Sequence, residues 1–369
     1  SGYAFLPAET FRAGPPCTNE DSGRLKHPAD RWDSQPVQGV SSLRPAPDDT
    51  FWALSDNGFG TRSNSSTYLL CLYRLKIDWL TVNGGSGSVT VIETIELSDP
   101  HDLAGFRITR NRENERRLTG ADFDPESLEL GEDGTFWIGD ERGPWLLHLS
   151  PTGALLEPPI HALLESGGKR RILRSPDHPH GKFFWLVNHD RSRGFEGLAF
   201  HAPTGVYYLL LEGTLRNERS SWLQAFAYRP GLSNATAHGW RYRMESRDHS
   251  AGELTYWREQ DVFLVVERDQ GHGSQARFKK IYAWQPQVDS AAKREVADLM
   301  NVGDPDHLAG ESGSYRMPYV TIESVLPLDS RTIMVCNDNN FPMTGGRTAQ
   351  EKDGTEFALL RVVIAGERH

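Results

Sequence analysis

The chain has 369 residues, of which 37% are hydrophobic and 10% aromatic, so it can bury a large core. Its formal net charge of −10 argues against a nucleic-acid partner, because a protein that binds a polyanion needs a basic surface. No run approaches the ~18 apolar residues of a membrane span, and no signal-peptide pattern opens the chain.

One sequence unit recurs five times along the chain, as two β-rich runs joined by a turn. The units span residues 37–58, 125–143, 195–213, 252–269 and 322–340. Each begins with Glu or Gln, carries Gly, Asp or Pro at its centre and ends on an acid or amide, which is typical of a β-hairpin. Further strand-like stretches follow the hairpins, and about four strands per unit is the pattern of a β-propeller blade.

We therefore predict an all-β fold, a single β-propeller domain over residues 1–369 with insertions between its blades. Five blades are recognisable, and the wide interval between the first two hairpins leaves room for a sixth. The N-terminal stretch 3–7 is predicted to complete the last blade and close the ring. Residues 161–171 form the one modest helix candidate.

Three cysteines, Cys17, Cys71 and Cys336, are too few for a disulfide scaffold and lack the spacing of a zinc site. A Cys17–Cys71 disulfide with one spare thiol and three separate buried thiols both remain open.

The acids of the five hairpins are predicted to converge. In a hairpin, the start of the first strand lies beside the end of the second. This rule pairs Gln38 with Asp56, Glu126 with Asp140, Glu196 with Glu212, Glu253 with Glu267, and Glu323 with Asp338. If the hairpins are the inner strands of blades, all five pairs point to one mouth of the central channel.

So many carboxylates need protonation, arginine or a divalent cation to balance them. A single acid of this kind more often braces a turn, but five-fold recurrence at one end favours a shared ligand. Oxygen ligands without cysteine suit Ca²⁺ rather than zinc. The predicted metal ligands are Asp56, Glu126, Asp140, Glu141, Glu196, Glu212, Glu253, Glu267, Glu323 and Asp338.

Basic and polar residues next to these acids suggest a catalytic group. Arg142 and Arg268 directly follow the acidic strand ends, and with Arg193 they are predicted to hold an anion. His189 precedes Glu196 and is predicted to move a proton, and Asp269 lies on a loop at the same face. Solvated loops explain these residues equally well. No nucleophile elbow, Walker loop or HExxH motif is present.

Residues 118–160 closely resemble the phytase-like family, described as having esterase-like activity of phytase. "GFEGLAF", "GELTYW…VERD", "KKIYAW" and "IESVLPLD…NDNNFP" are similar to further blocks of that family, over about residues 37–363. The resemblance implies hydrolysis of phosphate or other esters by a bacterial protein that is secreted or periplasmic. The acids it carries over are Glu126, Asp140, Glu141, Glu196, Glu253, Glu267, Asp269, Glu323 and Asp338. Gln38 stands where the other four repeats have Glu.

The sequence thus predicts a monomeric, calcium-dependent hydrolase of a small phosphate ester or related anionic ester. Two alternatives stay open. One is a lactonase or sugar-processing propeller with one axial metal, and the other is a non-catalytic propeller in which calcium staples the blades.

Overall fold

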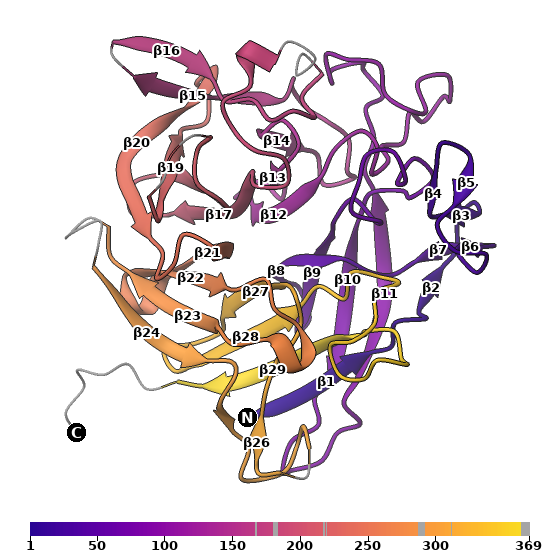
Figure 1. The fold of residues 1–369 in the computed structure, drawn as a ribbon, viewed down its shortest axis with the longest axis vertical. Helices are drawn as coiled ribbons and strands as arrows, with labels where there is room; N and C mark the ends of the chain where they lie inside the picture. The colour runs from indigo at the N-terminus through magenta and orange to yellow at the C-terminus, as the bar shows by residue number, and fades with distance from the viewer. Residues whose placement is uncertain are drawn as a thin grey trace.

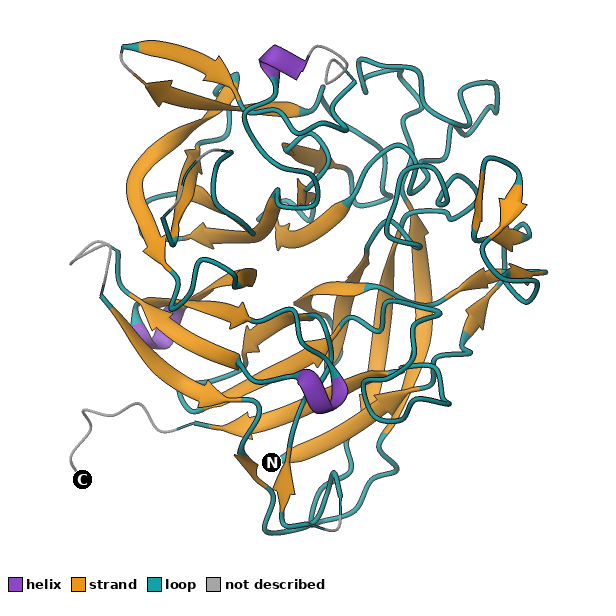
Figure 2. Ribbon diagram, in the orientation of Figure 1, coloured by secondary structure: helices purple, strands orange, loops and turns teal. Residues whose placement is uncertain are grey.

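The computed structural model describes residues 1–166, 168–179, 184–216, 218, 220–286, 292–310 and 312–362. Strands surround a central axis in this part of the chain (Figure 1). Its helices are three short 3-10 turns, η1 (Phe184–Leu186), η2 (Arg258–Gln260) and η3 (Gly273–Gln275) (Figure 2). None of the helices in the described ranges has the length and apolar character that a membrane crossing requires.

The long strands group into five units of four strands each. Hydrogen bonds between outer strands join the fifth unit to the first and the second to the third, so the units form an eight-stranded, a nine-stranded and a four-stranded sheet. The first unit is β8 (Val40–Ala46), β9 (Thr50–Ser55), β10 (Cys71–Asp78) and β11 (Ser88–Glu96). The second is β12 (Pro125–Leu130), β13 (Phe136–Asp140), β14 (Trp145–Leu149) and β15 (Ile160–Ser166). The third is β17 (Phe195–His201), β18 (Val206–Leu211), β19 (Trp222–Tyr228) and β20 (Asn234–Arg243). The fourth is β21 (Ser250–Trp257), β22 (Val262–Arg268), β23 (Lys279–Trp284) and β24 (Lys293–Asp298). The fifth is β27 (Ile322–Pro327), β28 (Thr332–Asn337), β29 (Thr355–Arg361) and β1 (Gly2–Leu6).

Shorter strands decorate the edges of these units. They are β2 (Phe11–Arg12), β3 (Cys17–Thr18), β4 (Glu20–Asp21), β5 (Arg24–Leu25), β6 (Arg31–Trp32), β7 (Gln35–Pro36), β16 (Lys169–Ile172), β25 (Val302–Gly303) and β26 (Ser314–Tyr315).

The apolar core lies between neighbouring units. Five clusters of buried side chains occur among the described residues, and each draws its strand residues from two adjacent units. The first strand of every unit contacts the first strand of the next, from β8 through β12, β17, β21 and β27 back to β8. Sheets that pack face to face in a closed ring define a β-propeller, so the predicted fold class is confirmed.

The N-terminal strand closes the ring, as predicted. β1 pairs antiparallel with β29, from Gly2 opposite Leu359 to Leu6 opposite Thr355. Its outer edge pairs in parallel with β11 of the first unit, at Phe5 and Ser88. The last unit is therefore built from both ends of the chain (Figure 1).

Two expectations are corrected. Residues 161–171 lie in the antiparallel hairpin β15–β16 and not in a helix, and residue 167 is outside the described ranges. Pairing of β15 with β14 and β20 overrides the local helix propensity. The three cysteines are free and buried, so the Cys17–Cys71 disulfide is wrong. Cys17 and Cys71 belong to different core clusters, and their sulfurs contact Thr67 and Ser55 respectively.

The wide interval between the first two hairpins holds no further four-stranded unit. Residues 97–124 are all described, and they form turns and isolated bridges such as Leu69 with Thr119.

Candidate functional site

Every inner hairpin carries a β-bulge at the same place, near the start of its first strand. The bulged residues are Ser41, Glu126, Glu196, Gly252 and Glu323. In each hairpin, the residue before the bulge pairs with a residue near the end of the second strand. The residues that directly follow these partners are Asp56, Glu141, Glu212, Arg268 and Asp338. A bulge re-aims its side chain out of the strand's ordinary alternation. The two positions therefore form a ring around one mouth of the channel.

All eight charged residues at these positions line one cavity of about 380 Å³. Seven of them are carboxylic acids and the eighth is Arg268. Each is at most 8% exposed. We call this cavity the acidic mouth.

Carboxylates in the acidic mouth are close enough to share a cation. Three groups have ligand oxygens within 4.8 Å of one another: Asp124, Glu126 and Glu141; Glu126, Glu196 and Glu323; and Glu141, Glu196 and Glu212. Each of the three groups could hold a metal ion. Glu196 belongs to two of them, and its buried Oε2 has no hydrogen-bond partner in the part of the chain that the structure describes.

Arginine balances only part of this charge. The Arg268 Nη2 lies 3.1 Å from Glu212 Oε1, 3.4 Å from Glu323 Oε1 and 3.8 Å from Glu196 Oε1. Arg193 Nη1 lies 3.4 Å from Glu212 Oε2. Arg191 also lines the cavity but pairs with Asp177 at 2.7 Å. Negative charge is thus in excess when the acids are ionised.

Ionisation of these acids is unfavourable in the folded protein. Burial, followed by repulsion from neighbouring carboxylates, raises the pKa of Asp56, Glu126, Glu141 and Glu196 well above the ordinary range. For the same reasons the pKa of Asp338 rises to about 8. Burial acts to lower the pKa of Arg268, but Glu212, Glu323 and Glu196 together raise it. A divalent cation would relieve the repulsion among these acids.

Three of the predicted ligands do not line the acidic mouth. Asp140 accepts the backbone N–H groups of Asp124 (2.8 Å) and Gly143 (2.6 Å), so it braces a turn. Glu267 accepts hydrogen bonds from Tyr242 (3.0 Å) and Lys293 (2.7 Å).

Glu253, the third, belongs to a second buried network farther along the inner strands. It accepts a hydrogen bond from Ser42 (2.9 Å) and lies 3.5 Å from Arg44. The Arg44 Nε lies 3.3 Å from Glu129, and its Nη2 donates to the carbonyl of Leu198 (2.8 Å). Gly252 and not Glu253 is the bulged residue of its hairpin, and a shift of one residue turns a strand side chain to the other face.

Some of the predicted catalytic residues line the acidic mouth and others do not. Arg268 and Arg193 line the acidic mouth, whereas Arg142 donates to the carbonyls of Gly120 (2.6 Å) and Phe123 (3.2 Å). Asp269 forms an ion pair with Lys279, whose Nζ lies 2.8 Å from the Asp269 Oδ1.

His189 is fully buried behind the mouth and does not line it. Its Nε2 contacts the carbonyl of Arg193, and burial lowers its pKa to about 4. His189 therefore holds the loop that carries Arg191, Ser192 and Arg193.

Several residues of the site were not predicted. Asp124 belongs to one of the metal-ligating groups, and its Oδ1 accepts a hydrogen bond from Asn57 (2.6 Å). Gln270 and Thr321 also line the cavity. The signal for Asp124 in the sequence was its place in "DPE", directly before β12 and two residues from Glu126.

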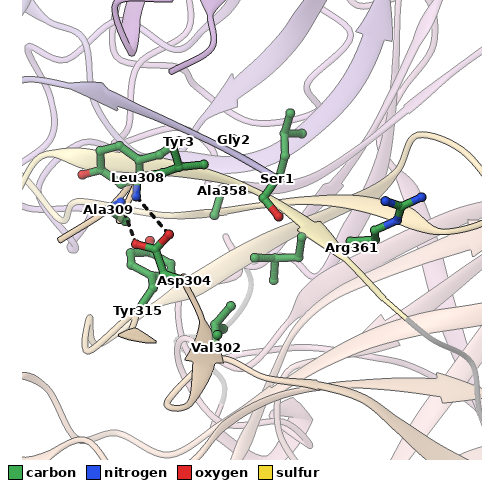
Figure 3. A pocket seen from close by; sticks show the side chains of 13 residues that line it. Ser1, Gly2, Tyr3, Val302, Asp304, Leu308, Ala309, Tyr315, Ala358 and Arg361 are labelled. Carbon is green, nitrogen blue, oxygen red and sulfur yellow. Dashed lines mark hydrogen bonds between the residues drawn. The ribbon is translucent and has the colours of Figure 1, made fainter. Parts of the chain in front are cut away.

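A separate cavity of about 290 Å³ lies beside β1 and β29 (Figure 3). Its acid, Asp304, accepts the backbone N–H groups of Leu308 and Ala309, each at 2.9 Å. Because that carboxylate already caps a turn and the other lining residues are mostly apolar, the cavity lacks the chemistry of the acidic mouth.

Residues 35–341 match the family described as "Phytase-like: Esterase-like activity of phytase". The match covers most of the chain, and the protein belongs to this family.

Similarity to individual proteins is weaker. An "Uncharacterized secreted protein" of Arthroderma benhamiae is 28% identical over 104 residues, which are 26% of this chain and 20% of that protein's length. The periplasmic gluconolactonase PpgL of Pseudomonas aeruginosa is 14% identical over 92% of this chain and 91% of its own, with a TM-score of 0.37. An exo-β-1,3-galactanase of Phanerochaete chrysosporium is 7% identical over 98% of this chain and 64% of its own, with a TM-score of 0.45.

Proposed function

We propose that the protein is a calcium-dependent hydrolase of anionic esters, with phosphate esters the first class to test, and that the acidic mouth is its active site. The observation that carries this proposal is the buried carboxylate of Glu196. Its Oε2 has no hydrogen-bond partner among the described residues, and Glu196 belongs to two groups of converging acids. Membership of a family described by esterase-like activity supports the reaction class.

The residues present fit a calcium ion. Glu126, Glu141, Glu196, Glu212 and Glu323 supply hard oxygen ligands, and the described residues of the cavity lining include no cysteine or histidine. When bound, calcium would polarise the ester and acidify a water molecule.

The chain's own residues would do the rest. Arg268 and Arg193 line the cavity and would orient the anionic group of the substrate. Asp338, whose pKa burial raises to about 8, could accept a proton from water at alkaline pH, where it is ionised.

Two observations favour this function over the alternatives. Three arginines line the cavity, which suits an anionic ester better than a neutral lactone. Gly60, Arg191 and Ser192 are exposed parts of the lining, so a bound ion would be within reach of solvent and substrate. A calcium ion that only stapled the blades would not need this access.

We further propose that the protein acts outside the cytoplasm as a monomer on a small-molecule substrate. The similar Arthroderma protein is named as a secreted protein, which supports this location.

Metal content, stability and turnover test the proposal together. Elemental analysis should find calcium in the purified protein, and EDTA should lower the melting temperature. At a free calcium concentration of 100 times Kd, the ion should add about 2.7 kcal/mol to the free energy of unfolding.

Turnover should require calcium and should favour benzyl phosphate over benzyl acetate, the neutral ester of the same alcohol. Absence of both bound metal and calcium-dependent stabilisation would overturn the metal site. Faster turnover of a γ-lactone than of any phosphate ester would favour the lactonase instead.

A further inference from the structure

A second cavity, of about 590 Å³, adjoins the acidic mouth. Asp56, Gly60 and Asn340 line both cavities, so the two cavities share a wall. We call the second cavity the side chamber. Its remaining walls come from the N-terminal segment 19–30, the turn 58–59 and the loop 341–352.

Aromatic and apolar side chains form one wall of the side chamber. Phe59, Phe341, Pro342 and Met343 all line it. Trp32 stacks on Phe59 with ring centroids 5.5 Å apart, and its centroid lies 5.1 Å from that of Phe341. Trp32 thus holds both phenyl groups in place. Phe341 is 1% exposed and supports this wall from behind, whereas the half-buried Phe59 gives a preorganised surface for another flat ring.

Several polar side chains of the side chamber already have partners within the protein. Asn19 donates to Asp30 (3.0 Å) and accepts from Asn64 (3.0 Å). Lys352 pairs with Glu9 (2.8 Å) and lies over the Phe341 ring, 5.1 Å from its centroid. The wall is therefore better suited to an aromatic group than to a polyhydroxylated one, whose hydroxyls would need hydrogen bonds.

We infer that the side chamber binds the leaving group of the ester, and that the preferred substrates are anionic esters of alcohols that carry an aromatic ring. This inference rests on the proposed function, because the acidic mouth must hold the anionic group next to Asp56 and Asn340. Hydrolysis of such a phosphate ester forms a bond from water oxygen to phosphorus and breaks the phosphorus–oxygen bond to the alcohol. One water proton leaves on the alcohol and the other stays on phosphate.

Two substrates and three variants test the inference. Benzyl phosphate and methyl phosphate have leaving alcohols of similar acidity, so they differ mainly in the ring. Phe59→Leu and Phe341→Leu keep an apolar side chain and remove the ring face. Phe106→Leu is the matched control, because Phe106 stacks on Trp145 (5.7 Å) and lines a different cavity.

The measurement is kcat/KM for both esters at a fixed calcium concentration, with the melting temperature of each variant. We expect each side-chamber variant to lower kcat/KM for benzyl phosphate about threefold to tenfold, as one aromatic contact is worth. The value for methyl phosphate should stay within about twofold, and Phe106→Leu should change neither ester selectively. Equal losses for both esters, or no loss for benzyl phosphate, would overturn the inference.

A binding experiment separates failure of the side chamber from failure of the proposed function. Calorimetry on calcium-loaded protein compares benzylphosphonate with methylphosphonate. Both have a carbon–phosphorus bond in place of the ester bond, so neither can be hydrolysed. Tighter binding of benzylphosphonate that is lost in Phe59→Leu, without turnover of any ester, would support the side chamber and overturn the hydrolysis. Turnover of both esters with no preference between the phosphonates would do the reverse.

Discussion

Glu196 has three properties together that no other described acid of the mouth combines. It occupies a bulge, it belongs to two metal-ligating groups, and one of its buried oxygens has no hydrogen-bond partner among the described residues. Glu196→Gln keeps the shape of the side chain and removes the charge. We expect calcium affinity to fall by about tenfold or more and ester turnover to fall with it, since a charged ligand is lost. Calcium calorimetry and steady-state kinetics measure both effects.

The matched control for Glu196→Gln is Glu253→Gln. Glu253 is equally buried but lies in the Arg44 network, so its variant should keep wild-type calcium affinity. If Glu196→Gln bound calcium and turned over ester as the wild type does, Glu196 would not be part of the site.

Arg268 is the cation on which three carboxylates of the mouth depend. Arg268→Met keeps much of the apolar stem and removes the contacts with Glu212, Glu323 and Glu196. Because a broken buried ion pair leaves uncompensated charge, we expect about 3–5 kcal/mol less stability in EDTA. Calcium should recover part of this loss. Urea unfolding with and without calcium measures it, and Arg277→Met, on an exposed loop, should be close to neutral.

At the scale of the strand, the bulge decides which acid reaches the mouth. Glu253 follows the bulged Gly252 and meets Arg44, which Glu129 approaches more closely (3.3 Å against 3.5 Å). One guanidinium carries a single positive charge and cannot neutralise two acids. Burial accordingly raises the pKa of Glu253 from 4.5 to about 8, although Arg44 acts to lower it.

Glu253→Gln should therefore change how stability depends on pH. In the wild type, the folded state keeps a proton between pH 4.5 and about 8 that the unfolded state releases, so stability falls as pH rises through this window. Glu253→Gln has no titrating carboxyl at this position, so it does not lose this stability as pH rises. We expect it to gain a few kcal/mol relative to the wild type between pH 5 and pH 8, at about 1.4 kcal/mol per pKa unit. Urea unfolding at several pH values measures the difference, and a constant difference would contradict the raised pKa.

The same bulges mark the limit of what the sequence could predict. Turn residues and recurring acids were enough for the hairpins, the propeller and the convergence of Glu126, Glu196 and Glu323. They could not fix the register, because "GELTYW" aligns with its counterparts equally well with Glu253 or Gly252 at the bulge. Gly252 is required there because a Cβ would lie 2.4 Å from the carbonyl oxygen of Ile322. Only the packing of adjacent inner strands carries this information.

At the scale of the whole molecule, the ring brings distant segments into one site. Asp56 follows the second strand of the first unit and Asp338 follows the corresponding strand of the last. β1 joins these two units by pairing with β29 on one side and β11 on the other. Closure of the ring and assembly of the acidic mouth are therefore coupled.

Substitutions in β1 test this coupling. Leu6 is 2% exposed and packs in the core between the first and last units, whereas the adjacent Phe5 is 38% exposed. Leu6→Asp should cost about 3 kcal/mol or more, because it removes buried apolar volume and introduces an unpaired charge. Phe5→Asp places the same charge on the outer face and should cost about 1 kcal/mol or less.

Urea unfolding measures these costs, and calcium calorimetry shows whether they reach the site. Leu6→Asp should weaken calcium binding as well as stability, since it disrupts the packing between the two units that carry Asp56 and Asp338. Phe5→Asp should leave calcium binding unchanged. Equal losses of stability at the two positions would mean that β1 is not held by its inward side chains. Unchanged calcium affinity in a destabilised Leu6→Asp protein would mean that the acidic mouth forms without closure of the ring.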